Sequence, residues 1–150
     1  MNLQTRKEII REAKTRVVAS FDVYNVPYVY QEMILESFDA RDWDIMKMDG
    51  CTGVFDYWPN KMSPACTPHD FQFTSGRGGH VSNVLFYEVC KMYTLPAAKS
   101  YRRYIGTRIG WALWFKWKHK RAGNVKPITE KMRLAFEFTK KNGKFKAYTN

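Results

Sequence analysis

Apolar residues recur at helical spacing along most of this chain, and proline or glycine separates one run from the next. Near the N-terminus, Ile9, Ile10, Ala13 and Val17 share one face of an amphipathic helix, and Thr5-Arg6-Lys7-Glu8 has the form of a capping box before it. No two segments have the alternation of paired strands, so the sequence predicts an all-α fold. The expected helices cover about residues 5–19, 27–39, 81–94, 97–119 and 129–141, with a further helix that includes His69 and Phe73.

Glycine and proline also predict where the chain is not helical. Residues 49–62 are rich in Gly, Asn, Asp and Pro and predict a loop, and Ser75-Gly76 predicts the end of the helix that carries His69. Pro68 leaves two alternatives: either this helix begins there with Thr67 as its N-cap, or Pro68 kinks it. In the first case His69 lies at the positive end of a helix, which favours neutral imidazole.

A length of 150 residues is enough for one domain with a proper core and too short for two. The expected parts of this single domain are N-terminal helices over about 1–45, a motif core over 48–93, a basic aromatic helix over 97–121 and a tail over 142–150.

The positive charge of the chain is concentrated in one region. The net charge is +11, and the stretch from Val89 to Thr129 holds ten Lys or Arg residues and no Asp or Glu. Such a balance favours acidic partners, meaning nucleic acid or an anionic membrane surface.

The helix predicted over 97–121 mixes cations, aromatics and aliphatics. We expect a core-facing stripe of Tyr101, Ile105, Ile109, Ala112 and Leu113. Three interpretations compete: an ordinary core helix with a solvated basic face, an in-plane membrane anchor with Trp at the interface, and a nucleic-acid surface with stacking aromatics. The candidate membrane or polyanion contacts are Arg102, Arg103, Trp111, Trp114, Lys116, Trp117, Lys118 and Lys120.

The N-terminus is charged throughout and lacks the apolar stretch of a signal peptide, and no run reaches the roughly 18 apolar residues of a membrane span. We therefore expect synthesis as a soluble protein in the cytoplasm, and action outside a cell would need delivery by something other than this segment. Three cysteines allow at most one intramolecular disulfide, and composition alone favours reduced thiols.

The chemistry of the chain is concentrated in two short segments. Asp49-Gly50-Cys51 is followed, after fourteen residues, by Cys66-Thr67-Pro68-His69-Asp70. His69 is suited to act as a general base, because the reference pKa of histidine lies near neutrality. Asp49 and Asp70 could supply carboxylate oxygens to a hard cation such as calcium.

These segments, with Asn83-x-x-Phe86-Tyr87-Glu88 on the next predicted helix, resemble the prokaryotic-type secreted phospholipase A2 family. They resemble equally an uncharacterised phage-encoded family with a related His–Asp helix, which implies synthesis in a host cell followed by association with a virion or delivery to the cell envelope. The similarity covers about residues 48–93. It implies a phospholipase A2-like domain in which the His–Asp helix packs antiparallel on the following helix, with further helices at both ends.

The resemblance also implies a role for each matching residue. His69 would take a proton from the water that attacks the sn-2 ester. Asp49 and Asp70 would hold Ca²⁺ together with a backbone carbonyl near Gly50, and the cation would polarise the ester carbonyl. Cys51 and Cys66 would form the disulfide that joins the loop to the helix.

Two positions depart from the family: Pro68, immediately before His69, and Asn83 on the next predicted helix. The aspartate that holds the catalytic imidazole is replaced here by Asn83. An asparagine can accept a hydrogen bond but cannot stabilise an imidazolium by charge, and in serine proteases the equivalent change costs about 10⁴ in rate.

Three functions therefore stay open. The first is calcium-dependent hydrolysis of phospholipid esters at a membrane surface by a phage- or virus-encoded protein. The second is a catalytically weak or inactive scaffold that assembles with other virion proteins. The third is nucleic-acid binding by the basic helix, which no recognised motif supports.

Overall fold

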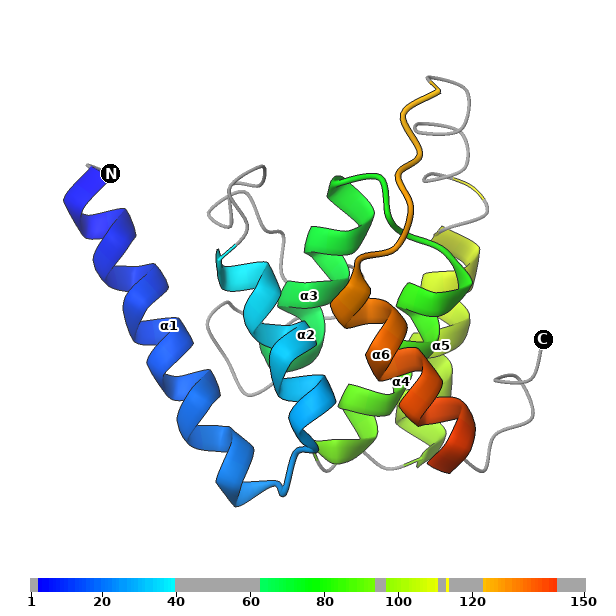
Figure 1. The fold of residues 1–150 in the computed structure, drawn as a ribbon, viewed down its shortest axis with the longest axis horizontal. Helices are drawn as coiled ribbons and strands as arrows, with labels where there is room; N and C mark the ends of the chain where they lie inside the picture. Colours follow the sequence, from blue (N-terminus) through cyan, green and yellow to red (C-terminus); the bar gives the residue numbers. More distant parts are fainter. Residues whose placement is uncertain (1–2, 40–62, 94–96, 111–112, 114–122, 143–150) are drawn as a thin grey trace.

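The computed structural model describes residues 3–39, 63–93, 97–110, 113 and 123–142. These residues form six helices and no strand, which confirms the all-α class (Figure 1). The helices are α1 (Leu3–Val23), α2 (Tyr28–Asp39), α3 (Ser63–Thr74), α4 (His80–Met92), α5 (Ala97–Gly110) and α6 (Glu130–Asn142).

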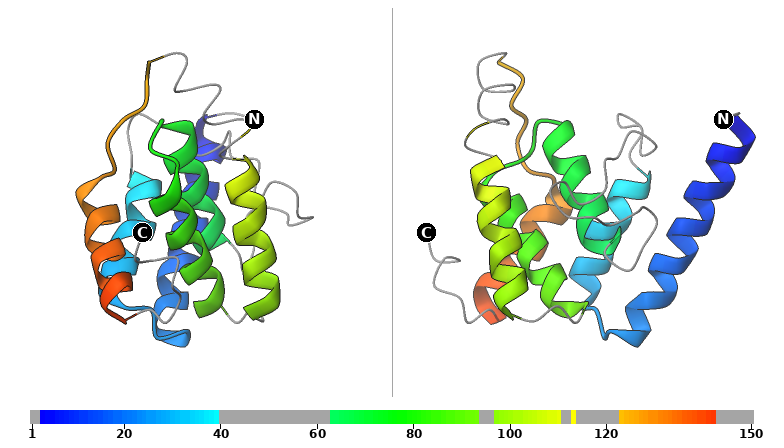
Figure 2. Two further views of the ribbon diagram at one scale, coloured as in Figure 1. Left: turned by 90° about the vertical axis from the view of Figure 1, so that its right-hand side faces the viewer. Right: turned by 180° about the vertical axis from the view of Figure 1, so that it is seen from behind.

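The helices run up and down beside one another, and α4 lies at the centre. It packs against α3, α5 and α6, while α2 packs against α3 and α6 and also carries α1 on its outer side (Figures 1 and 2). Helices α3, α4 and α5 are successively antiparallel, whereas α2 and α3 run in the same direction. Helices α3 and α4 thus form an antiparallel pair over residues 63–92.

Local sequence explains most of the helix ends. Helix α2 begins directly after Pro27, whose carbonyl accepts hydrogen bonds from the N–H groups of Tyr30 and Gln31. Helices α4 and α6 lie within two residues of the predicted bounds, and α1 is longer than predicted at both ends. The helix predicted over 97–119 is described as far as Gly110, and the predicted tail beyond residue 142 lies outside the described residues.

Helix α3 begins before Pro68, so the first of the two alternatives, in which it begins at that proline with Thr67 as N-cap, is wrong. The helix starts at Ser63 and continues through Pro68 to Thr74. Proline at this position removes one helical N–H donor, and burial of both Thr67 and Pro68 accompanies the continued helix. His69 therefore lies within the helix and not at its positive end.

The main core joins the first two helices to α3, α4 and α6. Its largest fully buried side chains include Tyr30, Met33 and Ile34 from α2, Leu85 from α4 and Met132 from α6. Burial of each large apolar side chain contributes about 1.5–3 kcal/mol. The core therefore holds α3 and α4, which carry the predicted site, in a fixed pair.

The predicted core-facing stripe of α5 is wrong at Tyr101, Ile109 and Leu113, whereas Ile105 is partly buried against the core and Ala112 lies outside the described residues. Tyr101 and Ile109 are 45% and 54% exposed, and Leu113 is 74% exposed. Instead, α5 turns Ser100 and Tyr104 inward. Tyr104 determines which side of α5 faces the bundle, because its ring packs into a second core cluster together with residues of α4.

That second cluster consists of Val84 and Tyr87 from α4 and Tyr104 from α5. The rings of Tyr87 and Tyr104 lie 5.7 Å apart, which is within the range of a favourable aromatic pair. Tyr104 buries more area than any one of the smaller aliphatic residues of the predicted stripe would bury. Its burial therefore determines which side of α5 faces α4.

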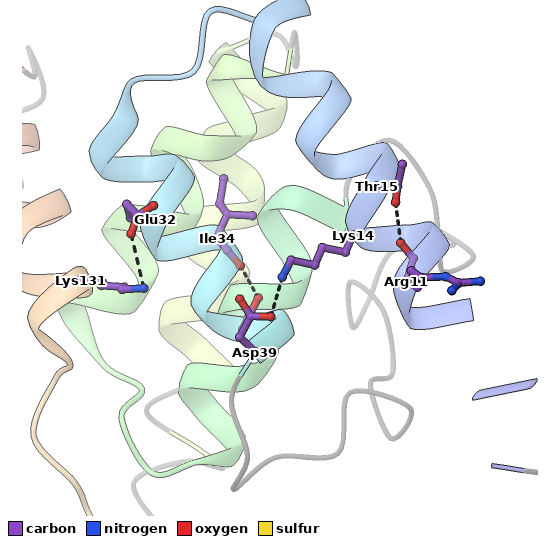
Figure 3. Close-up of polar contacts among 8 residues, drawn as sticks. Arg11, Lys14, Thr15, Glu32, Ile34, Asp39 and Lys131 are labelled. Atoms are coloured by element: carbon purple, nitrogen blue, oxygen red, sulfur yellow. Dashed lines mark hydrogen bonds and ion pairs between the residues drawn. The ribbon is translucent and has the colours of Figure 1, made fainter. Parts of the chain in front are cut away.

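Polar contacts connect helices that are distant in sequence. Lys14 of α1 donates to Asp39 at the end of α2 at 2.6 Å, and Lys131 of α6 lies 3.5 Å from Glu32 of α2 (Figure 3). Such exposed pairs contribute about 0–1 kcal/mol each. No described helix is long and apolar enough to cross a membrane.

Candidate active site

His69 of α3 and Asn83 of α4 meet across the antiparallel helix pair. The His69 Nε2 atom lies 3.1 Å from the Asn83 Oδ1 atom, and Asn83 is 1% exposed. The turn between the two helices contains Gly76 and Gly79, which have φ angles of 83° and 146° that favour glycine. The sequence-predicted pair of His69 and Asn83 is thus brought together.

The hydrogen bond selects one form of the imidazole. Because the Asn83 Oδ1 atom can only accept, the His69 Nε2 atom carries the proton and donates it. The Nδ1 atom then keeps its lone pair. A base therefore remains on the side of the ring that does not contact Asn83.

The ring is neutral at pH 7. Burial lowers the pKa of His69 from 6.5 to about 4, and the hydrogen bond to Asn83 opposes this shift without cancelling it. One of the two alternatives for Pro68 predicted neutral imidazole from a helix end, but the cause in the structure is burial of the ring. The same burial makes His69 a weak base, since Asn83 supplies no negative charge to stabilise the imidazolium.

Two aromatic rings fix the orientation of the imidazole. The ring of Phe73 lies 4.4 Å from that of His69, and the ring of Phe86 lies 4.7 Å away. Phe73 is one turn further along α3, and Phe86 comes from α4 one turn after Asn83. Together with the hydrogen bond, these contacts leave the imidazole little freedom to turn.

A narrow, mostly apolar pocket borders the imidazole. It is closed in this structure, because the space between its side chains does not admit a water molecule. An acyl chain would therefore have to displace some of these side chains to enter it. The pocket is lined by Met33, Ala65, Pro68, His69, Gln72, Leu85, Phe86 and Val89.

Gln72 is a buried polar member of this site that the sequence reasoning missed. The Ser82 hydroxyl donates to the Gln72 Oε1 atom at 2.6 Å, and the Gln72 Nε2 atom donates to the Met33 sulfur at 3.4 Å. These bonds tie α3 to both α4 and α2. The available signal was a glutamine between two phenylalanines, three residues after His69.

The predicted calcium ligands are described only in part. Asp70 follows His69 on α3 and is partly buried, whereas Asp49 and Gly50 lie outside the described residues. The described part of the chain holds no group of three or more His, Cys, Asp or Glu side chains that could bind a metal ion. Calcium needs six to eight oxygens, of which Asp70 can supply one or two.

The cysteines differ in their state. Cys66 is buried and disulfide-bonded, while Cys90 is a buried thiol in the core that forms no disulfide. Cys51, the predicted partner of Cys66, lies outside the described residues. The Cys51–Cys66 pairing therefore stays a prediction.

Of the residues predicted for the basic surface, the first two lie in the described part of the chain. Arg102 is exposed on α5, and Arg103 is partly buried. The remaining predicted contacts lie outside the described residues: Trp111, Trp114, Lys116, Trp117, Lys118 and Lys120.

Comparisons of the chain with protein-family models, curated proteins and solved structures found no match. The functional case therefore depends on the residues around His69.

Proposed function

We propose that this protein hydrolyses phospholipid ester bonds, with His69 as the general base. The observation that carries the proposal is the hydrogen bond from His69 Nε2 to Asn83 Oδ1, which leaves the lone pair on Nδ1. A neutral, oriented imidazole with one free nitrogen is what proton abstraction from water requires.

The reaction follows from that geometry. The His69 Nδ1 atom takes a proton from a water molecule, whose oxygen attacks the ester carbonyl carbon. When the tetrahedral intermediate collapses, the C–O bond to the glycerol breaks and the imidazolium returns the proton to the departing alkoxide. Calcium, held by Asp70 with the predicted ligands Asp49 and Gly50, would supply the charge that stabilises the oxyanion.

The surroundings of His69 favour an apolar substrate. Phe73 and Phe86 flank its ring, and the adjacent pocket is lined mainly by aliphatic and aromatic side chains. An ester that carries an acyl chain matches this lining better than a charged or strongly hydrated ester does.

The test is fatty-acid release from labelled phospholipid vesicles by the full chain, with calcium and with a chelator. We expect calcium-dependent release that is lost in His69→Gln. His80→Gln is the matched control, because His80 is also partly buried and begins α4 outside the pocket. No release, or equal release from His69→Gln, would overturn the proposal.

A second candidate is a scaffold without catalysis that assembles with other virion proteins. Two observations favour it: Asn83 provides no charge for the imidazolium, and the pKa of His69 is low for a base at neutral pH. In that case His69 and Asn83 serve only to join α3 to α4. The substitution Asn83→Asp distinguishes the two candidate functions. An increase in fatty-acid release would support the enzyme, and continued inactivity would support the scaffold.

A further inference from the structure

Helix α5 presents cationic and apolar side chains together on its outer face, which we define as Tyr101, Arg102, Gly106, Arg108 and Ile109. All five residues are exposed. Arg102, Gly106 and Ile109 are spaced four and three residues apart, so they form one stripe along the helix. Leu113, which follows the helix, is more exposed than Tyr101 or Ile109.

This face points away from the rest of the described bundle. Helix α5 packs mainly against α4 and lies at the edge of the described structure (Figure 2). The inner side is occupied by Tyr104 in its cluster with α4. An added Cβ at Gly106 or Gly110 meets nothing within 4 Å, so open space surrounds this part of the helix.

The face is positively charged without local compensation. The chain has no Asp or Glu between Val89 and Thr129. Among the described residues, no ion pair involves Arg102 or Arg108. The guanidinium of Arg108 contacts the Tyr104 ring at 5.8 Å, which leaves its donors available to an external anion.

We propose that the outer face of α5 docks the protein on an anionic phospholipid bilayer. The arginines match the negative head groups, and Ile109 with Tyr101 can enter the boundary between head groups and acyl chains. The proposal depends on the proposed function only for the choice of a phospholipid surface. It assigns the partner to a helix distinct from α3, which carries His69.

The aliphatic residues favour a bilayer over nucleic acid. A nucleic acid would use Arg102 and Arg108 for phosphate contacts but would leave the Ile109 and Leu113 side chains against a hydrated backbone. A bilayer removes apolar area from water and neutralises the cations at the same time. Single exposed aliphatics are ordinary, but here they share a helix face with the cations.

The experiment measures binding of the full chain to vesicles of ether-linked phosphatidylcholine, with and without ether-linked phosphatidylglycerol. Ether lipids have no ester to hydrolyse, so docking is measured separately from the reaction. We expect binding that requires the anionic lipid and weakens with salt. Arg102→Gln and Arg108→Gln should each weaken it about fivefold.

The apolar contribution is tested by substitutions at Ile109 and Gly106. Ile109→Ser should weaken vesicle binding about tenfold, because it removes one inserted aliphatic side chain. Gly106→Trp should strengthen binding about tenfold, since the open space at Gly106 accepts an indole on the same stripe. The matched controls lie on α1: Val18→Ser and Arg11→Gln, both at exposed positions, should bind within about twofold of wild type.

Three results would overturn the proposal. The first is wild-type vesicle binding by Ile109→Ser, and the second is an equal loss in the α1 controls. The third is binding to duplex DNA but not to vesicles, with DNA affinity reduced by the arginine substitutions alone. Vesicle binding without fatty-acid release from ester lipids would instead reject the proposed hydrolysis and leave the docking face intact.

Discussion

His69 illustrates how one residue's environment decides its chemistry. The family resemblance placed Asn83 beside the imidazole, and one of the two alternatives for Pro68 made that imidazole neutral. The second expectation depended on a helix that begins at Pro68, whereas α3 begins at Ser63. Tertiary burial by Phe73 and Phe86 lowers the pKa of His69, and no local pattern reveals that.

The lowered pKa of His69 predicts how stability depends on pH. The folded-state value of about 4 lies below the unfolded value of 6.5, so between these values the unfolded chain binds a proton that the folded chain does not. This residue should therefore remove up to roughly 3 kcal/mol of stability as pH falls from 6.5 to 4. Urea unfolding of wild type, His69→Phe and the control His80→Gln measures it. The His69→Phe variant should lack this component, and an unchanged pH dependence would count against it.

An acid at position 83 should reverse the direction of the pKa shift. In Asn83→Asp a carboxylate replaces the amide beside His69 Nε2, and its negative charge stabilises the imidazolium inside a buried pair. We expect the pKa of His69 to rise above 6.5. A titration of the histidine ring protons by nuclear magnetic resonance tests this, and a pKa that stays near 4 would show that the two side chains are not in contact.

At the scale of helices, periodicity predicts where elements lie better than which face they bury. Helix α4 lies within two residues of its predicted bounds and buries Leu85 and Val89, four residues apart, in the core. Helix α5 leaves Tyr101 and Ile109 of its predicted stripe exposed, since that stripe competes with Tyr104, for which α4 provides a partner in Tyr87. The rotation of α5 depends on a side chain of another helix, so the sequence of α5 alone could not predict it.

Two glycines should respond to alanine in opposite directions. Gly106 has helical geometry and open space, so Gly106→Ala should stabilise the protein by about 0.5–1 kcal/mol. Gly76 has a φ angle of 83° after α3, and Gly76→Ala should destabilise it by about 1 kcal/mol or more. Thermal unfolding of both variants measures the difference. Stabilisation by both would mean that α3 ends differently.

At the scale of the whole molecule, contacts between distant helices hold the site pair in place. Tyr30 of α2 and Thr139 of α6 form a buried hydrogen bond across 109 positions of sequence. The Tyr93 hydroxyl likewise lies 2.5 Å from that of Ser20, which joins the end of α4 to α1. Such pairs could not be predicted from the sequence, because nothing local relates the partners.

The Tyr30–Thr139 bond predicts a measurable coupling between α2 and α6. Tyr30→Phe keeps the ring and removes the hydroxyl, so the free energy of unfolding should fall by about 1 kcal/mol. Thr139→Val should cost more, because its hydroxyl also donates to the Ala135 carbonyl. A double-mutant cycle by urea unfolding isolates the pair, and additive effects would exclude direct contact.

The central claim is that the oriented His69 is a base for phospholipid hydrolysis whose strength is limited by Asn83. The most direct measurement is the rate of fatty-acid release from labelled phospholipid by wild type, Asn83→Asp and Asn83→Asp combined with His69→Gln. We predict slow release by wild type, an increase of about tenfold or more in Asn83→Asp, and none in the double variant. No release by either wild type or Asn83→Asp would contradict the claim and favour the scaffold.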